Sequence, residues 1–394
     1  MGAINLDNTG SGGAITLSSD GTSLLLGGTA IGGGGADLYA ANEVSVTTQP
    51  SATGDDAVAI GDSASASAAN SFAMGHSASA SAGYSIALGR NASATGSNGA
   101  AVGFNTTAGT QAIALGNGAV ASGNNSIAGP GGTASGINSN AFGSGAEASN
   151  LGGAAFGRYA TTAVNNYNVA IGNSYASGAE ALAAAIANRT ASYGATGANS
   201  IAIGNLAKST NTQSLAISGN TTTASGIQAT SIGGENNTAS GTRATALGGS
   251  TNYATGQESY AFGNRASAKE VGKHSYGGYF GFSGTFAGGF GVGGSQGGMM
   301  ILGAATTDAT PTVLRSNTSA AGSTNQLVAF TDTAITFEGS VTGIQNGAQA
   351  FASFLISGLL VNDGGTTTLV NSATTVIDNQ SSWALALSAD NTNN

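Results

Sequence analysis

The stretch 85–123, SIALGRNASATGSNGAAVGFNTTAGTQAIALGNGAVASG, decides the fold of this chain. It contains one short phrase three times, as Ala87-Leu88-Gly89, Ala101-Val102-Gly103 and Ala114-Leu115-Gly116. The glycines of these phrases are 14 and 13 residues apart. Self-similarity at a nearly fixed period indicates a repeat architecture, in which each unit packs only on its neighbours.

The same phrase returns along residues 54–277 at intervals of 13 to 17 residues, most often 14 or 15, which gives about sixteen copies. Three copies are degenerate, because Ala128-Gly129 lacks the large apolar residue and Ala187 and Ser218 replace the glycine. The other copies are Ala59-Ile60-Gly61, Ala73-Met74-Gly75, Phe142-Gly143, Phe156-Gly157, Ile171-Gly172, Ile203-Gly204, Ile232-Gly233, Leu247-Gly248 and Phe262-Gly263.

Each copy predicts two short strands. One arm has large apolar residues two positions apart, as in 85–88 (SIAL), and the other alternates small residues, as in 63–67 (SASAS). Alternation with period two is typical of strands. The glycine after the apolar pair stands where the chain must reverse, so we expect a positive φ there. The repeat therefore predicts a flat roll of two-stranded coils, and sixteen coils stacked ~4.8 Å apart give a rod of roughly 75 Å.

The roll carries a row of Ile, Leu, Val, Met and Phe and a companion row of Ala and Ser, which lets backbones approach closely. A coil this thin cannot enclose both rows. Packing three rolls around an axis buries the large side chains and leaves strand edges only at the ends. We therefore predict an obligate homotrimer.

Composition excludes several classes of function. Among 394 residues, 66 are Gly and only 7% are charged, which is typical neither of a globular enzyme nor of a charge-driven disordered tail. The net charge of −9 has the wrong sign for binding nucleic acid. The chain has no Cys and no run of 18 apolar residues, and its first 13 residues lack the features of a secretory signal. We expect no membrane insertion.

Residues suited to catalysis or to binding a cofactor or metal do not form a recognisable set. The only two histidines, His76 and His274, are far apart, and His76 occupies a turn position. Asp55 and Asp56 are adjacent, so in a strand they point to opposite faces. The remaining candidate carboxylates fall at differing repeat positions: Glu147, Glu180, Glu235, Glu258 and Glu270.

We therefore predict no catalytic, cofactor or metal site. Neighbouring chains of a trimer can still bring carboxylates together, so a polysaccharide-degrading tailspike stays an alternative. The GxGxxG string at 289–294 is expected by chance in so Gly-rich a chain. Residues 180–187 have helical propensity but lie in register with the repeats, so we predict a strand there.

The stretch 85–123 resembles the head repeats of trimeric autotransporter adhesins of the YadA type, and the resemblance extends over about 54–277. It implies a trimeric, left-handed, parallel β-roll with an adhesive role. Adhesins of that family also carry a signal peptide, a coiled-coil stalk and a membrane anchor, and we expect none of these from the flanking sequence.

Residues 1–53 predict two strands, 15–17 and 24–26, joined by a turn at Asp20-Gly21. The segment resembles the N-termini of virion fibre and structural proteins of marine and cyanobacterial tailed phages, which implies attachment to the particle. Residues 278–298 form a Gly-rich aromatic neck, expected either to plug the end of the roll or to contact sugar or membrane. The aromatic side chains of this region are Tyr276, Tyr279, Phe280, Phe282, Phe286 and Phe290.

Residues 299–394 predict an antiparallel, sandwich-like β domain with a turn at 362–365 (NDGG). The runs ATTDATPTVL, GGTTTLVNSATTVI and WALALSADNTN resemble the C-terminal domain of phage tail-fibre and virion proteins. Further strands usually follow in that family, so truncation of the domain at Asn394 is an alternative, and whether the chain continues past this residue stays open. The expected strands are 312–314, 326–330, 351–356, 368–370 and 383–387.

Together these features predict a non-enzymatic virion fibre of a tailed phage. The N-terminal segment is expected to dock on other virion proteins, the roll to act as a rigid spacer and the C-terminal domain to contact a glycan or protein on the host surface. The alternatives are a capsid-attached head fibre or decoration protein, the tailspike already mentioned, and a fragment of a bacterial surface adhesin head. The receptor, and whether the tail or the capsid carries the fibre, stay open.

Overall fold

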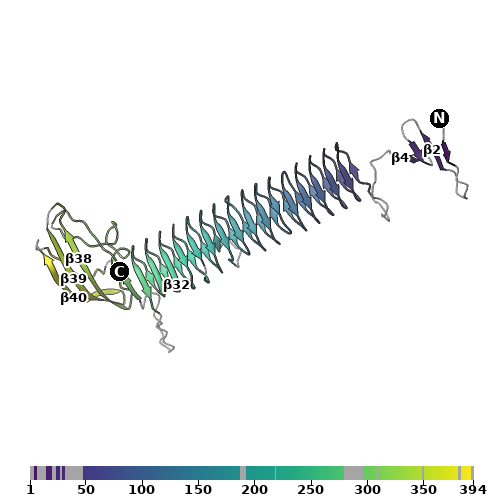
Figure 1. The fold of residues 1–394 in the computed structure, drawn as a ribbon. Helices are drawn as coiled ribbons and strands as arrows, with labels where there is room; N and C mark the ends of the chain where they lie inside the picture. The colour runs from purple at the N-terminus through teal and green to yellow at the C-terminus, as the bar shows by residue number, and fades with distance from the viewer. Residues whose placement is uncertain are drawn as a thin grey trace, which may run out of the picture. The chain divides into compact units, whose positions relative to one another are not determined.

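The computed structural model describes residues 4–6, 15–19, 24–26, 29–31, 48–186, 192–217, 219–278, 296–308, 310–347, 350–379 and 383–391. All assigned elements in them are strands (Figure 1). The chain divides into two compact units, unit 1 (Met1–Asn173) and unit 2 (Ser174–Asn394). The predicted fold class is confirmed as a parallel β-solenoid of about 16 turns with a C-terminal antiparallel sheet. In the part of the chain just specified, no helix meets the length and hydropathy of a membrane span.

The first four strands form an antiparallel meander in unit 1. The predicted strands at 15–17 and 24–26 are confirmed, and they pair with Leu17 opposite Leu26. The turn predicted at Asp20-Gly21 lies outside the described residues. The strands are β1 (Ile4–Leu6), β2 (Ile15–Ser19), β3 (Leu24–Leu26) and β4 (Thr29–Ile31).

Each coil of the roll contributes one strand of three or more residues, here called the longer strand and shortened to two residues only in β16, and one two-residue strand. Like strands of successive coils pair in parallel. The longer strands of unit 1 are β6 (Val58–Ile60), β8 (Phe72–Met74), β10 (Ile86–Leu88), β12 (Ala100–Val102), β14 (Ile113–Leu115), β16 (Ile127–Ala128), β18 (Asn140–Phe142), β20 (Ala154–Phe156) and β22 (Val169–Ile171). Those of unit 2 are β24 (Leu182–Ala184), β26 (Ile201–Ile203), β28 (Leu215–Ile217), β30 (Thr230–Ile232), β32 (Thr245–Ser250), β34 (Tyr260–Asn264) and β36 (His274–Gly277).

The two-residue strands form the opposite wall of the roll. In unit 1 they are β5 (Ser51–Ala52), β7 (Ser65–Ala66), β9 (Ser79–Ala80), β11 (Ser93–Ala94), β13 (Thr107–Ala108), β15 (Val120–Ala121), β17 (Thr133–Ala134), β19 (Glu147–Ala148) and β21 (Thr161–Thr162). In unit 2 they are β23 (Tyr175–Ala176), β25 (Gly194–Ala195), β27 (Lys208–Ser209), β29 (Thr223–Ala224), β31 (Thr238–Ala239), β33 (Tyr253–Ala254) and β35 (Ser267–Ala268).

The interior of the roll is built almost entirely from small side chains. Ala87, the middle residue of β10, and Ala94 of β11 are fully buried, and alanine holds the equivalent positions in most coils. Buried hydroxyls bond locally, as where Ser85 Oγ donates to the Ala82 carbonyl at 2.6 Å. Because the two walls lie too close for larger residues, the predicted companion row of Ala and Ser fills the coil. The strand predicted within 180–187 is confirmed as β24.

The turn glycines have the predicted positive φ, for example 124° at Gly89 and 137° at Gly103. They also stack closely, because a Cβ on Gly89 would lie 2.3 Å from the Gly103 carbonyl oxygen. Asparagine, which tolerates the left-handed region, recurs at other turn positions, and Asn91 Nδ2 donates to Asn105 Oδ1 at 2.8 Å in the next coil.

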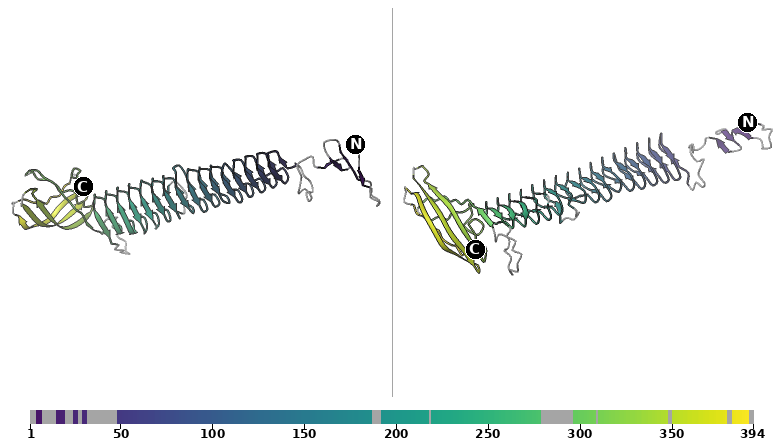
Figure 2. Two further views of the ribbon diagram at one scale, coloured as in Figure 1. Left: turned by 45° about the horizontal axis from the view of Figure 1, so that its top comes forward. Right: turned by 60° about the horizontal axis from the view of Figure 1, so that its bottom comes forward.

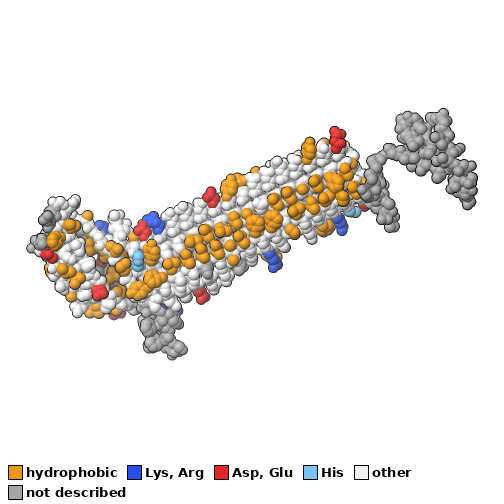
Figure 3. All heavy atoms as spheres, in the orientation of Figure 1, with side chains coloured by type: hydrophobic (Ala, Val, Ile, Leu, Met, Phe, Trp, Pro, Cys, Tyr) orange, Lys and Arg blue, Asp and Glu red, His pale blue; other side chains and the backbone are white. Residues whose placement is uncertain are grey.

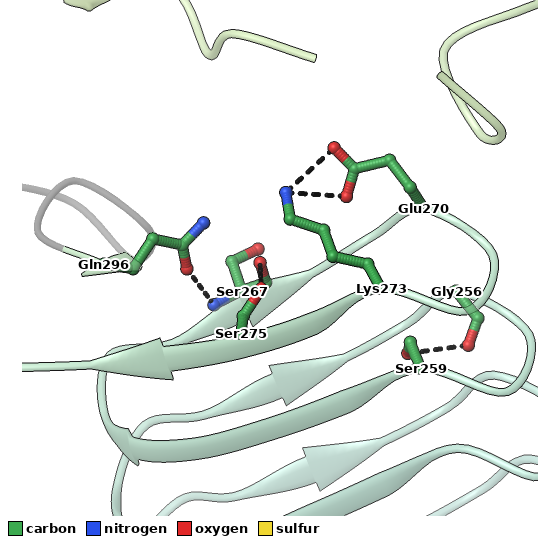
Figure 4. Close-up of polar contacts among 7 residues, drawn as sticks. All are labelled: Gly256, Ser259, Ser267, Glu270, Lys273, Ser275 and Gln296. Atoms are coloured by element: carbon green, nitrogen blue, oxygen red, sulfur yellow. Dashed lines mark hydrogen bonds and ion pairs between the residues drawn. The ribbon is translucent and has the colours of Figure 1, made fainter. Parts of the chain in front are cut away.

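The last coil of unit 2 is capped by the chain that follows it. Strand β37 (Gln296–Met299) pairs antiparallel with β36, and Gln296 Oε1 accepts a hydrogen bond from the Ser267 amide at 2.7 Å (Figure 4). The Val271 amide donates to the Thr324 carbonyl at 2.7 Å. Residues 315–330, here called the cap segment, thus cover the end of the roll. Of the aromatics predicted to plug it, only Tyr276 is described; those at 279–290 lie outside the described residues.

Three long antiparallel strands form the C-terminal sheet in the order β38 (Thr333–Ile344), β39 (Phe351–Asp363) and β40 (Thr366–Asn379) (Figure 2). The strands expected at 351–356 and 368–370 lie within β39 and β40, and the turn at 362–365 joins them. Sequence reasoning missed β38, in which Thr, Gly and Ser interrupt the apolar alternation.

Three expected strands are not formed. Residues 312–314 are extended beside a single bridge between Gly303 and Arg315, and 326–330 belong to the cap segment. Residues 383–387 form no strand, and the Asn379 side chain bonds the Trp383 backbone: Oδ1 accepts from the Trp383 amide and Nδ2 donates to the Trp383 carbonyl, both at 2.8 Å. Apolar alternation alone therefore does not decide strand pairing in these segments.

Candidate trimer interface

The longer strands turn two rows of mostly apolar side chains outward. Because side chains alternate along a strand, burying the middle residue directs the residues on either side of it to the surface. Row 1, the first residue of each such strand, contains Val58, Phe72, Ile86, Ala100, Ile113, Ile127, Asn140, Ala154, Val169, Leu182, Ile201, Leu215, Thr230, Thr245, Tyr260 and His274. Row 2, two residues later, contains Ile60, Met74, Leu88, Val102, Leu115, Phe142, Phe156, Ile171, Ala184, Ile203, Ile217, Ile232, Leu247, Phe262 and Tyr276.

These rows leave much apolar surface in contact with solvent in a single chain. Exposed fractions reach 43% at Leu115, 45% at Phe262 and 56% at Tyr276. Figure 3 shows the rows as stripes of hydrophobic side chains on the roll. Monomeric proteins rarely expose contiguous apolar patches of this kind. Covering the open half of one Ile or Leu would contribute about 1 kcal/mol, so a partner that covers many coils at once gains a large free energy.

The rows are also shaped for close contact. Where row 1 shrinks to Asn140 and Ala154, row 2 carries Phe142 and Phe156, whose rings stack 5.8 Å apart. The degenerate copy at Ala128-Gly129 has a physical reason, since a Cβ on Gly129 would lie 2.6 Å from the Phe142 ring. The glycine makes room for the aromatic side chain of the next coil.

The opposite face of the roll is polar. The first residue of each two-residue strand and the residue after that strand point outward, as Ser79 and Ser81 do beside β9 and Ser93 and Thr95 beside β11. Hydroxyls that face water need no partner, so this face is suited to remain in solvent. The roll therefore has one face with exposed apolar rows and one polar face.

Charged side chains gather at the turns between these faces. His76 lies in a turn as predicted, with Nε2 3.5 Å from Asp62 Oδ2. Arg243 pairs with Glu258 of the next coil, and the hydrogen bond from Arg243 holds the pKa of the Glu258 carboxyl below its usual range. His274 lies in row 1, its ring centroid 4.6 Å from that of Tyr260.

The candidate carboxylates do not converge. Asp55 and Asp56 lie in a turn, where Asp56 has φ 55°, so the expectation that they point to opposite faces of a strand is wrong. The remaining candidates belong to different coils: Glu147, Glu180, Glu235, Glu258 and Glu270. Among the described residues, no group of three His, Asp or Glu side chains is placed to hold a metal ion. The GxGxxG string lies outside those residues.

Six segments match the model of the YadA head domain repeat: residues 52–78, 80–106, 108–128, 195–217, 224–251 and 254–274. The chain contains YadA head repeats. Three matched segments lie in unit 1 and three in unit 2, and together they include most of the longer strands that form rows 1 and 2. No curated protein matches the chain. YadA-like head repeats are typical of trimeric adhesins, which is consistent with a homotrimer.

Sequence reasoning missed a buried ion pair. Glu270 and Lys273 lie in the last turn of the roll, where they are inaccessible and form an ion pair (Figure 4). The cap segment adds Phe330, whose ring centroid is 4.4 Å from Lys269 Nζ and 5.8 Å from Lys273 Nζ. The sequence signal was a Lys at a core position that holds Ser or Ala in most other coils, since Ser259 is the equivalent residue one coil earlier.

Proposed function

We propose that this chain forms a homotrimeric fibre, that the fibre is part of a phage virion, and that it serves surface attachment. The observation that carries the trimeric fibre is the pair of outward apolar rows, which a single roll leaves uncovered. The YadA head repeats support the same arrangement, because such repeats suggest an adhesin-like fibre.

In this proposal the roll is a rigid spacer. Within each unit its coils are joined by parallel ladders, and its interior holds small side chains with little freedom to rearrange. Function then belongs to the ends. The N-terminal segment would dock on other virion proteins, and the C-terminal sheet would contact a host-surface glycan or protein. Three copies of a weak site on one fibre gain by avidity.

The phage assignment rests on the flanks. Residues 1–53 resemble N-terminal segments of phage virion proteins, and 364–377 and 383–393 resemble a C-terminal domain of phage tail-fibre proteins. A bacterial surface adhesin is the second candidate, favoured by the repeats themselves. We also propose that the chain is not an enzyme, because the five candidate glutamates of the roll belong to different coils and the two histidines, His76 and His274, are far apart in the chain.

Quantitative mass spectrometry of cell and particle fractions tests this proposal. In a phage-producing culture of the source, tryptic peptides of this chain should be enriched in density-purified particles relative to the surface fraction of uninfected cells. Enrichment in the cell-surface fraction instead would favour the adhesin and overturn the virion assignment.

A binding experiment tests attachment. The full chain, fluorescently labelled, should bind host cells and reduce adsorption of the phage that carries it. Saturating protein that neither binds nor competes would contradict the attachment role. Release of new reducing ends from host polysaccharide would contradict the non-enzymatic part of the proposal.

A further inference from the structure

His274 is the only Asp, Glu, His, Lys or Arg in rows 1 and 2. It lies in row 1, in β36 of the last coil, and it is exposed in a single chain. Among the described residues its ring nitrogens have no hydrogen-bond partner. An unpaired imidazole therefore stands among side chains that otherwise suit burial.

The proposed trimer brings three copies of His274 together. Rotation about a three-fold axis keeps each residue at the same height, so equivalent residues of the apolar rows surround the axis in one layer. Packing there would remove the imidazole nitrogens from water, and a polar group buried without a partner costs free energy. One ligand bound by all three imidazoles would remove this cost.

We propose that the three His274 imidazoles, one from each copy, bind one divalent transition-metal ion such as Zn²⁺. Neutral imidazole is the commonest protein ligand of such ions. Three histidines are an established ligand set for Zn²⁺, with nitrogen–metal distances of about 2 Å and a water molecule in the fourth position. One chain supplies only one of the three ligands, so a single roll shows no metal site. The inference rests on the proposed trimer, and the ion would hold its three chains in register at the end of the roll.

The residues around His274 suit this role. Tyr260, one coil earlier in row 1, has its ring centroid 4.6 Å from that of His274. Met299 of β37 lies directly opposite His274 on the other side of β36. These two side chains confine the imidazole to its own layer of the row. The adjacent Lys273 is buried in the roll and paired with Glu270 at 2.8 Å, so its charge is neutralised before it can repel a cation at the surface.

His76 provides a matched comparison. It lies in a turn outside rows 1 and 2, with Nε2 3.5 Å from Asp62 Oδ2. Packing along the apolar rows does not gather its three copies around the axis, so we expect no shared site there. A ring of His274 imidazoles that bond only to one another, without metal, is the alternative arrangement, and the experiment distinguishes it.

Metal analysis of the full chain tests the proposal. The protein is stripped with EDTA, dialysed against Zn²⁺ and then against metal-free buffer, and its zinc is measured by inductively coupled plasma mass spectrometry. The trimer should retain one zinc per three chains. His274→Gln should lose roughly tenfold or more of it, because an amide does not replace the imidazole ligand. His76→Gln and the volume-conserving Met299→Leu should retain it in full.

Co²⁺ gives a second measurement that needs no variant. Bound to three nitrogens and a water in a four-coordinate site, it absorbs visible light far more strongly than the hydrated ion, and the absorption should saturate at one Co²⁺ per three chains. A native trimer that binds neither ion, or a His274→Gln trimer that keeps its zinc, would overturn the metal site. Zinc retained at one per chain would do the same. A native monomer would instead overturn the proposed trimer, which native mass spectrometry of the same samples shows.

Discussion

Lys273 and Glu270 form an ion pair inside the end of the roll, with Lys273 Nζ 2.9 Å from Glu270 Oε1 and 2.8 Å from Oε2. Neither side chain is accessible, at 6% and 0% exposed. Charges removed from water in this way depend on each other. The pair lies in the last coil of the roll, beside the cap segment. Breaking it therefore tests how much this capped end contributes to the stability of the roll.

Removing one partner should therefore be costly. We expect Lys273→Met to destabilise the roll of unit 2 by about 3–5 kcal/mol, because it leaves the Glu270 carboxylate buried and unpaired. The double variant Glu270→Leu/Lys273→Met should recover most of that loss. Urea unfolding followed by circular dichroism measures both. Arg243→Met, which breaks an exposed pair, is the matched control and should barely move the midpoint. Equal urea midpoints for the three variants would show that the buried pair contributes no more to stability than the exposed one.

The turn glycines should differ in their tolerance of a side chain. Gly89 and Gly118 both have positive φ, but a Cβ on Gly89 meets the Gly103 carbonyl oxygen at 2.3 Å, whereas one on Gly118 meets nothing within 4 Å. We expect Gly118→Ala to cost about 1–2 kcal/mol from backbone strain alone. Gly89→Ala should cost clearly more, since the next coil must also shift. Thermal unfolding compares the two, and the reverse order would show that stacking of the turns is not close.

The interior alanines should resist enlargement. Ala87→Leu adds three carbons between walls that touch, and such overpacking typically costs about 1–3 kcal/mol or more. Ile86→Leu, at the adjacent outward position, conserves volume and should leave the fold of the roll unchanged. Proteolysis under native conditions distinguishes them. A protease-resistant Ala87→Leu protein would mean that the coil has free internal space.

Added charge should disrupt the trimer when it is placed in the apolar rows but not when it is placed on the polar face. Leu88→Glu/Leu115→Glu places carboxylates in row 2, where association would bury them without partners, so we expect the trimer to dissociate. Ser81→Glu/Thr95→Glu adds the same charge to the polar face and should leave the assembly intact. Sedimentation velocity of both variants reads this out. If Ser81→Glu/Thr95→Glu dissociated the trimer and Leu88→Glu/Leu115→Glu did not, the interface would lie on the polar face and not on rows 1 and 2.

The roll was predictable because its repeat encodes every level of structure at once. In the phrase Ala87-Leu88-Gly89 the small residue points inward, the large one points outward and the glycine forms a turn. Because the same phrase recurs in coil after coil, the sequence favours one assignment of strands and turns. The C-terminal domain has no such redundancy. Gln326–Phe330 reads as a strand by alternation, yet it caps the roll, because contacts distant in sequence determine its pairing.

The apolar rows were partly predictable for the same reason. The sequence shows where large apolar residues alternate with small ones. The structure shows that the large residues point outward and the small ones inward. The Glu270–Lys273 pair could not be predicted, since two charges three residues apart are usually exposed in a turn. Their burial follows from the cap segment, which starts more than 40 residues later in the chain.

In the proposed trimer, rows 1 and 2 are covered by two further copies of the chain. Sedimentation equilibrium of the purified protein at physiological ionic strength tests it most directly. The account predicts one species with three times the 37.5 kDa mass of the chain, persisting on dilution to nanomolar concentration. A soluble, folded species of 37.5 kDa under the same conditions would contradict it.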